Sequence, residues 1–129
     1  MFEGYVPTES DEQETVIQWK EVAMYVEPRL ELLYAIPNGE WRHPATAARL
    51  KAEGVVSGVP DLCLPVPDGV FHGLYIEMKK RDHSNRPSKN QKRFIKLLSE
   101  QGYRVEVAYG SDEAIDILQG YLGMPSDQW

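Results

Sequence analysis

The spacing of apolar residues predicts a helix near the N-terminus. From Asp11 onward, apolar residues recur every three or four positions, at Val16, Trp19, Ala23, Val26 and Leu30. This spacing places them on one face of an amphipathic helix. Thr8 or Ser10 is suited to cap its N-terminus, and Pro28 is expected to end or kink it. Residues 1–10 are expected to form an irregular leader.

A continuous apolar run and a short amphipathic segment follow. Residues 32–36 read Leu-Leu-Tyr-Ala-Ile, which predicts a short strand buried on both faces. Pro37-Asn38-Gly39 has turn chemistry and ends it. Pro44 to Glu53 is expected to form a helix, since proline suits the first helical position and Gly54 suits the C-terminal cap.

Two alternating apolar runs around Pro67-Asp68-Gly69 predict a β-hairpin between Gly58 and Lys79. If the turn centres on Asp68 and Gly69, the numbers of facing residues sum to about 137–138. Asp61 then lies opposite Ile76 or Glu77.

Side chains alternate along a strand, so Glu77 and Lys79 share one face of the second run. Leu74, Ile76 and Met78 take the other face. The hairpin therefore brings Asp61 close to Glu77, with a lysine two residues further on.

The C-terminal half predicts a helix, a strand and a helix. Ser88 and Gln91 form a capping-box pattern ahead of the apolar positions Phe94, Ile95 and Leu98. Residues 103–108 alternate as a strand, and a last helix begins at Ser111 or Asp112. We expect residues 103–108 to pair beside the strand of Glu77 through a right-handed crossover.

The order of elements predicts an α/β fold, a central mixed β-sheet flanked by helices. The length of 129 residues fits a single domain over residues 1–129, with its core at about 11–123 between a short leader and a tail. No apolar run reaches the length of a membrane-spanning helix, and the N-terminus does not resemble a signal peptide. The single cysteine, Cys63, excludes an intrachain disulfide and suits a reducing cytoplasm.

Basic residues are concentrated in one segment. Residues 79–96 hold eight of the fourteen Lys and Arg residues and one acid, a net charge of +7, so the remainder carries −13 of the total of −6. A phosphate backbone responds to such local charge. The segment is a candidate nucleic-acid contact, although a charge run can also be a solvated face.

Asp61 and Glu77 are candidate metal ligands. Two facing carboxylates repel each other. A divalent cation bound between them would offset that repulsion, so the pair is a candidate metal site. Their hard oxygen atoms suit Mg²⁺ or Mn²⁺. Lys79 is placed to position or deprotonate a water molecule, or to neutralise phosphate charge.

These residues carry a family resemblance. Pro60-Asp61 followed by Glu77-Met78-Lys79 resembles the PD-(D/E)xK signature of restriction-endonuclease-like nucleases. The motifs are closer still to the VRR-NUC domain nucleases, through Gly58-Val59-Pro60-Asp61, Glu77-Met78-Lys79 and Gln91. Residues 35–39 and 50–55 are also similar to that family. The resemblance spans about residues 12–123.

The resemblance implies a restriction-endonuclease-like fold and metal-dependent hydrolysis of DNA phosphodiester bonds. Asp61, Glu77 and the Met78 backbone carbonyl would hold the Mg²⁺ or Mn²⁺ ion. Lys79 would act on the water, and Gln91 would support Lys79 or the water. Glu12 matches the acidic residue that the family carries at the start of its first helix, with Glu14 as the alternative. Either glutamate could instead be a solvated acid that the helix N-terminus stabilises.

Several residues keep two interpretations. Gln91 either closes the capping box or points to the site. Asn38 and the loop of residues 80–87 either have turn and solvent roles or contact DNA, and His43 suits a helix entry. The candidate DNA-binding residues are Asn38, Arg42, Lys80, Arg81, Arg86, Lys89, Lys92 and Arg93.

The resemblance is to stand-alone phage or bacterial members, which act as homodimers on branched DNA in the manner of Holliday-junction resolvases. It implies a bacterial or phage-infected cytoplasm. Apart from the resemblance, the sequence indicates a dimer only through aromatic residues that are expected to be exposed near the termini (Tyr5, Tyr121 and Trp129). The competing hypothesis is a non-catalytic DNA-binding or scaffolding domain, which the intact Asp61, Glu77 and Lys79 disfavour. A small-molecule metallohydrolase would need histidine ligands, and the three histidines lack ligand spacing.

Overall fold

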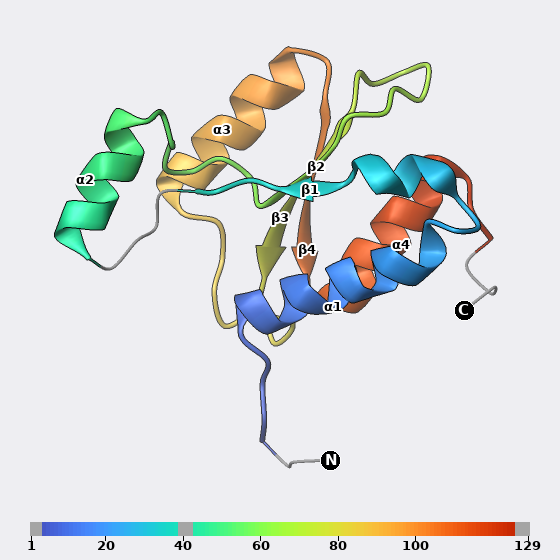
Figure 1. Cartoon of the computed structure of the whole chain (residues 1–129), viewed down its shortest axis with the longest axis horizontal. Helices are drawn as coiled ribbons and strands as arrows, with labels where there is room; N and C mark the ends of the chain where they lie inside the picture. Colours follow the sequence, from blue (N-terminus) through green and yellow to red (C-terminus); the bar gives the residue numbers. More distant parts are fainter. Residues whose placement is uncertain (1–3, 39–42, 126–129) are drawn as a thin grey trace.

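The computed structural model describes residues 4–38 and 43–125. The element bounds, in chain order (Figure 1), are α1 (Glu9–Ala23), the 3₁₀ helix η1 (Pro28–Leu32), β1 (Tyr34–Ala35), α2 (Pro44–Ala52), β2 (Leu62–Leu64), β3 (Leu74–Lys79), α3 (Lys89–Glu100), β4 (Arg104–Tyr109) and α4 (Ser111–Leu122). The described strands form one sheet in the order β1-β2-β3-β4. Strand β3 is antiparallel to β2 and parallel to β4. The predicted central mixed sheet flanked by helices is confirmed.

The hairpin register agrees with the sequence. Leu62 faces Ile76 and Leu64 faces Leu74, so the numbers of facing residues sum to 138. One step further along, this register brings Asp61 beside Glu77. The turn is closed by Asp68, whose Oδ1 accepts hydrogen bonds from the backbone amides of Val70 and Phe71.

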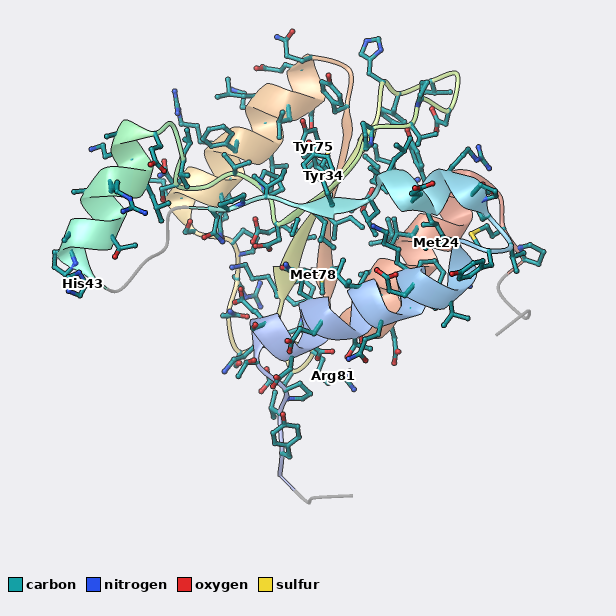
Figure 2. The ribbon with its side chains drawn as sticks, viewed as in Figure 1. Met24, Tyr34, His43, Tyr75, Met78 and Arg81 are labelled. Carbon is teal, nitrogen blue, oxygen red and sulfur yellow. The ribbon has the colours of Figure 1, made fainter. Side chains whose placement is uncertain are left out.

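The two faces of the sheet have different roles. Leu62, Leu74, Ile76 and Met78 lie in the buried core with residues of α1 and α4, such as Val16. Figure 2 shows Met78 between β3 and α1. Because side chains alternate, the odd-numbered residues of β3, which include Glu77 and Lys79, face the opposite side of the sheet. Helix α3 contributes Gln91 to that side.

The N-terminal helix begins after Thr8, one of its two predicted caps, and ends earlier than predicted. Its first residue is Glu9, because Thr8 and Asp11 form a complete capping box, so the expected irregular leader is shorter than residues 1–10. It ends at Ala23, and Val26 is 68% exposed instead of lying on the apolar face. Pro28 lacks the amide that a continuing helix would use, so Leu30 reaches the core from η1 instead.

The predicted buried strand at residues 32–36 is wrong. Only Tyr34 and Ala35 are in β1, and both are exposed. Strand β1 lies at one edge of the described sheet and is paired on one side by β2. Since η1 extends to Leu32, Leu33 is the residue of this run that becomes buried.

The aromatic residues near the termini are not all exposed as expected. Tyr121 is not exposed as expected: it is buried, and its hydroxyl donates to the Val66 carbonyl oxygen at 2.6 Å. Tyr5 is exposed, and Trp129 lies outside the described residues. Among the described helices, none has the length and apolar character needed to cross a membrane.

Gly58, at the start of the hairpin, is predicted to tolerate replacement by alanine less well than Gly69 in the turn. Its φ is +94°, and an added Cβ would lie 2.9 Å from the Asn90 carbonyl oxygen. Gly69 is a matched control, since its φ is +92° and no atom lies within 4 Å of an added Cβ. Gly69→Ala should lower the free energy of unfolding by about 1 kcal/mol through backbone strain. Gly58→Ala should cost about 1–3 kcal/mol more, because the added Cβ overpacks against α3.

Urea denaturation of the two variants measures the difference. Equal losses of stability in the two variants would show that the contact between Gly58 and Asn90 does not constrain the fold.

Candidate active site

The residues predicted to be catalytic are buried polar groups. Among the described residues, the buried polar or charged side chains are Glu12, Asp61, Glu77, Lys79, Gln91, Ser111 and Gln119. Burying a charge is costly unless it is paired. Five of these seven are the side chains that the sequence singled out, so the polar interior of this protein is concentrated where chemistry was expected.

Asp61 is held in place by both carboxylate oxygens. Oδ2 accepts the Met78 backbone amide at 2.7 Å, and Oδ1 accepts the Asn38 side-chain amide at 3.2 Å. Asn38 was predicted to form a turn or to contact DNA. In the structure it contacts Asp61, which gives it a positioning role in the site.

Glu77 is the most perturbed acid. Burial, and after it the adjacent Asp61 carboxylate, raises the pKa of Glu77 to about 9, and Lys79 acts in the opposite direction. Its Oε1 is buried and has no hydrogen-bond partner. A partnerless buried carboxylate oxygen beside a second carboxylate fits a divalent cation, which would satisfy that oxygen and offset the repulsion. The residues present therefore fit the expected metal at Asp61 and Glu77.

A third acidic ligand does not join this pair. Within the described ranges, no cluster of three or more His, Cys, Asp or Glu side chains could hold a metal ion. The expectation that the Met78 backbone carbonyl is a further ligand stays a prediction.

Gln91 fulfils both interpretations of its role. Its Oε1 accepts the Ser88 backbone amide at 2.8 Å and completes the capping box of α3. Its Nε2 donates to Glu77 Oε2 at 3.2 Å. One amide therefore ties the start of α3 to the acidic pair.

Lys79 lies between two carboxylates. Its Nζ is 3.8 Å from Glu77 Oε2 and 3.7 Å from Glu9 Oε2, and its side chain is buried. Glu9 also accepts a hydrogen bond from the Asn85 side-chain amide. The acidic residue of α1 that reaches this cluster is thus Glu9, which the sequence pattern did not single out.

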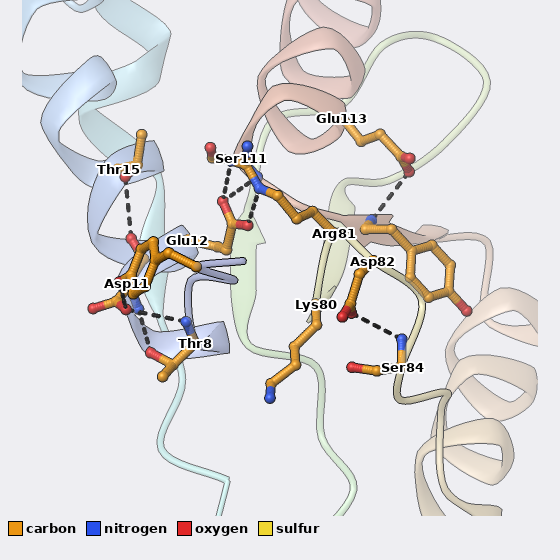
Figure 3. A network of polar contacts seen from close by, with 12 residues as sticks. Thr8, Asp11, Glu12, Thr15, Lys80, Arg81, Asp82, Ser84, Ser111 and Glu113 are labelled. Atoms are coloured by element: carbon orange, nitrogen blue, oxygen red, sulfur yellow. Dashed lines mark hydrogen bonds and ion pairs between the residues drawn. The ribbon is translucent and has the colours of Figure 1, made fainter. Parts of the chain in front are cut away.

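Glu12 forms a different interaction (Figure 3). Its carboxylate makes a two-pronged ion pair with Arg81, at 2.6 Å to Nε and 2.8 Å to Nη2, and accepts the Ser111 backbone amide at 3.1 Å. Glu12 therefore joins α1 to the segment after β3 and to the first residue of α4. Among the described residues, neither Glu12 nor Glu14 forms a hydrogen bond with Asp61 or Glu77.

A capping signal places Glu9 in the helix, although it does not tell which acid meets Lys79. Thr8 and Asp11 have the spacing of a capping box, which starts the helix at Glu9 and places it one turn before Glu12. A helix that started at Asp11 would instead leave Glu9 in the leader, where no helical face directs it toward the sheet.

The basic residues divide into two groups. Arg81 is engaged by Glu12, whereas Lys89, Lys92 and Arg93 are exposed on α3, where they can meet phosphate. Arg86 is also exposed, in the loop before α3. Lys80 is half-buried, and Figure 3 shows its side chain pointing away from the Glu12 network. Arg42 lies outside the described residues.

The loop of residues 80–87 has contacts within the protein. Asn85 Oδ1 accepts the Lys80 amide, and the His83 ring stacks on Tyr109 with centroids 3.9 Å apart.

Comparisons with known proteins agree with the motifs. The profile of the VRR-NUC domain matches residues 7–112. The chain belongs to the VRR-NUC family. A solved structure described as a "VRR_NUC domain protein" is 30% identical, with a TM-score of 0.77, over 94% of this chain and 93% of that chain. A search of curated protein sequences found no match. The VRR-NUC domain defines a family of nucleases, so this chain is a member of a nuclease family.

The ion pair of Glu12 and Arg81 predicts an asymmetric mutational effect. Arg81→Ala leaves a carboxylate that is 1% exposed without its cation, and should cost about 3 kcal/mol of unfolding free energy at pH 7. Glu12→Gln leaves Arg81, whose side chain is 46% exposed and can be solvated, and should cost about 1 kcal/mol. Urea denaturation compares the two.

At acid pH, the loss of unfolding free energy that Arg81→Ala causes should become smaller. Hydrogen bonds from Arg81 hold the pKa of Glu12 below its ordinary value of 4.5. A lowered folded-state pKa means that the stabilisation is complete above pH 4.5 and is lost as the pH falls through the folded value. If Arg81→Ala lowered the free energy of unfolding by the same amount at pH 3 and at pH 7, the ionised Glu12 carboxylate would not be the source of the stabilisation.

Proposed function

We propose that this VRR-NUC domain is a metal-dependent DNA endonuclease that hydrolyses phosphodiester bonds. The observation that carries the proposal is the buried pair of Asp61 and Glu77, with a partnerless Glu77 oxygen and Lys79 within 3.8 Å of Glu77. A purely structural site would not leave a buried carboxylate oxygen unsatisfied. The exposed basic residues of α3 support a phosphate-bearing substrate.

Each residue has a distinct task in the proposed mechanism. Asp61, Glu77 and the Met78 carbonyl would hold Mg²⁺ or Mn²⁺. When bound, the ion would activate a water molecule and stabilise the charge that develops on the phosphate and the leaving oxygen. Asn38 and Gln91 fix the two carboxylates through the hydrogen bonds described above.

Lys79 would orient or deprotonate the attacking water. Its ammonium lies between the carboxylates of Glu9 and Glu77, at 3.7 and 3.8 Å, and these two ion pairs hold it beside the acidic pair. Glu9, rather than Glu12, would then complete the acidic surroundings of Lys79.

The proposed substrate is branched DNA, including the Holliday junction, cut by a homodimer in a bacterial or phage-infected cytoplasm. A dimer would supply two sites for paired nicks. The support for these finer points is the resemblance to stand-alone relatives.

The first test is cleavage of labelled DNA in Mg²⁺ or Mn²⁺. The panel contains a four-way junction, a 5′ flap, single-stranded DNA and linear duplex. Lys79→Ala should slow cleavage about 100- to 10 000-fold, as expected when a general acid–base group is removed. Arg49→Gln, which removes an exposed charge on α2 outside the site, should cut at the wild-type rate.

Symmetric cuts in the junction would favour the dimeric resolvase. DNA binding without any cutting, unchanged by Lys79→Ala, would overturn the nuclease proposal and favour a scaffolding domain.

A second test compares the two acids of α1. Glu9→Gln should reduce the single-turnover cleavage rate about 10- to 100-fold, because Glu9 contacts the Lys79 ammonium. Glu12→Gln should reduce stability but leave the rate per folded molecule within about twofold, since Glu12 is paired with Arg81. The opposite pattern would return the acidic role to Glu12. Folded fractions are measured by circular dichroism under the assay conditions.

A further inference from the structure

A groove of about 670 Å³ lies between α2 and the first half of α3. Its described lining includes Lys51 from α2, Val56 and Ser57 from the segment that follows, and Asn90, Arg93 and Phe94 from α3. This volume is within the range of pockets that bind small organic groups.

The walls of this groove are not explained by core packing. Helix α2 has no buried residue, and Figure 1 shows it set apart from the sheet, beyond α3. Gln91 is the buried residue of α3, and Phe94 is half-buried but lies outside the hydrophobic core cluster and the side chains packed on it. Thr46, Ala47 and Leu50 are only half-buried, so α2 contributes little to the hydrophobic core. The groove is what α2 provides.

The chemistry of the groove combines cations with an apolar floor. Of its ten described lining residues, Lys51 and Arg93 are basic and none is acidic, in a chain whose net charge is −6. Phe94 offers an aromatic ring, flanked by small and aliphatic side chains. Phosphate alone would need only the cations, whereas an unstacked base together with its phosphate uses both parts.

The groove and the active site share a wall. Asn90 Nδ2 donates to the Ser57 carbonyl oxygen at 3.4 Å, and the Gly58 backbone packs against Asn90. The next residue, Gln91, contacts Glu77. The first turn of α3 therefore has the acidic pair on one side and the groove on the other.

We propose that this groove binds an unpaired nucleotide of the DNA substrate, with the base on Phe94 and the phosphates near Lys51 and Arg93. The inference rests on the proposed nuclease function and narrows its substrate. Branched DNA with a single-stranded arm would be preferred over fully paired DNA, because paired bases are stacked inside the duplex and cannot reach the ring.

The test measures binding of fluorescent DNA in magnesium on the Lys79→Ala background, which prevents cutting. The probes are one duplex with blunt ends and the same duplex with a short single-stranded extension, 5′ or 3′. Phe94→Leu keeps an apolar side chain but removes the ring, so it avoids the unfolding that Phe94→Ala risks. Lys51→Gln combined with Arg93→Gln removes the cations, and Arg49→Gln is the matched control on α2.

The background protein should bind the extended duplex more tightly than the blunt one. Phe94→Leu should weaken binding of the extended duplex about fivefold or more and leave blunt-duplex binding unchanged, because only an unpaired base stacks. The variant that combines Lys51→Gln with Arg93→Gln should also show a smaller preference for the extended duplex over the blunt one. Its salt dependence should be shallower, by about 0.7 in log–log slope for each phosphate that the protein no longer neutralises. Arg49→Gln should behave as the background protein.

Three results would overturn the inference alone, and the first two compare the blunt and the extended duplex. They are equal affinity for blunt and extended DNA in the background protein, and an unchanged preference in both groove variants while wild type still cuts DNA. Equal weakening of both probes would also overturn it, since that pattern reports general attraction to phosphate. A wild-type protein that neither binds nor cuts any DNA would overturn the proposed function itself.

Discussion

Two carboxylates buried side by side on neighbouring strands impose the main constraint on this structure. Burial, and after it the repulsion between Asp61 and Glu77, raises the pKa of Glu77 to about 9. The fold surrounds them with donors: the Met78 amide and Asn38 on Asp61, and Gln91 and Lys79 beside Glu77. The remaining Glu77 oxygen has no hydrogen-bond partner, and this is the observation on which the proposed metal site rests.

The first turn of α3 connects secondary structure to this chemistry. The Gln91 amide caps the helix and contacts Glu77, so the helix cannot shift without disturbing the acidic pair. The same turn borders the groove through Asn90. A single helix start thus couples helix stability, the acidic pair and a neighbouring surface with the chemistry to bind nucleotides.

A second buried carboxylate holds the surrounding elements together. Glu12 binds Arg81 and the first amide of α4, and so fixes the segment that leaves β3 immediately after Lys79. Glu9, one turn earlier, contacts Lys79 itself. Adjacent turns of α1 therefore divide their tasks: Glu12 anchors the framework, and Glu9 belongs to the surroundings of the catalytic lysine in the proposed mechanism.

The sequence by itself determined the elements, the mixed sheet and the hairpin register, because alternation, capping boxes and turn residues are local signals. Through the same alternation it placed Asp61 near Glu77 and Lys79. Only the tertiary structure decided which acid of α1 meets Lys79, since Glu9 and Glu12 lie on one helix and differ by where that helix docks. It also decided that β1 is a two-residue edge strand and that α2 and α3 enclose a groove. These features depend on contacts between distant segments, which no local pattern encodes.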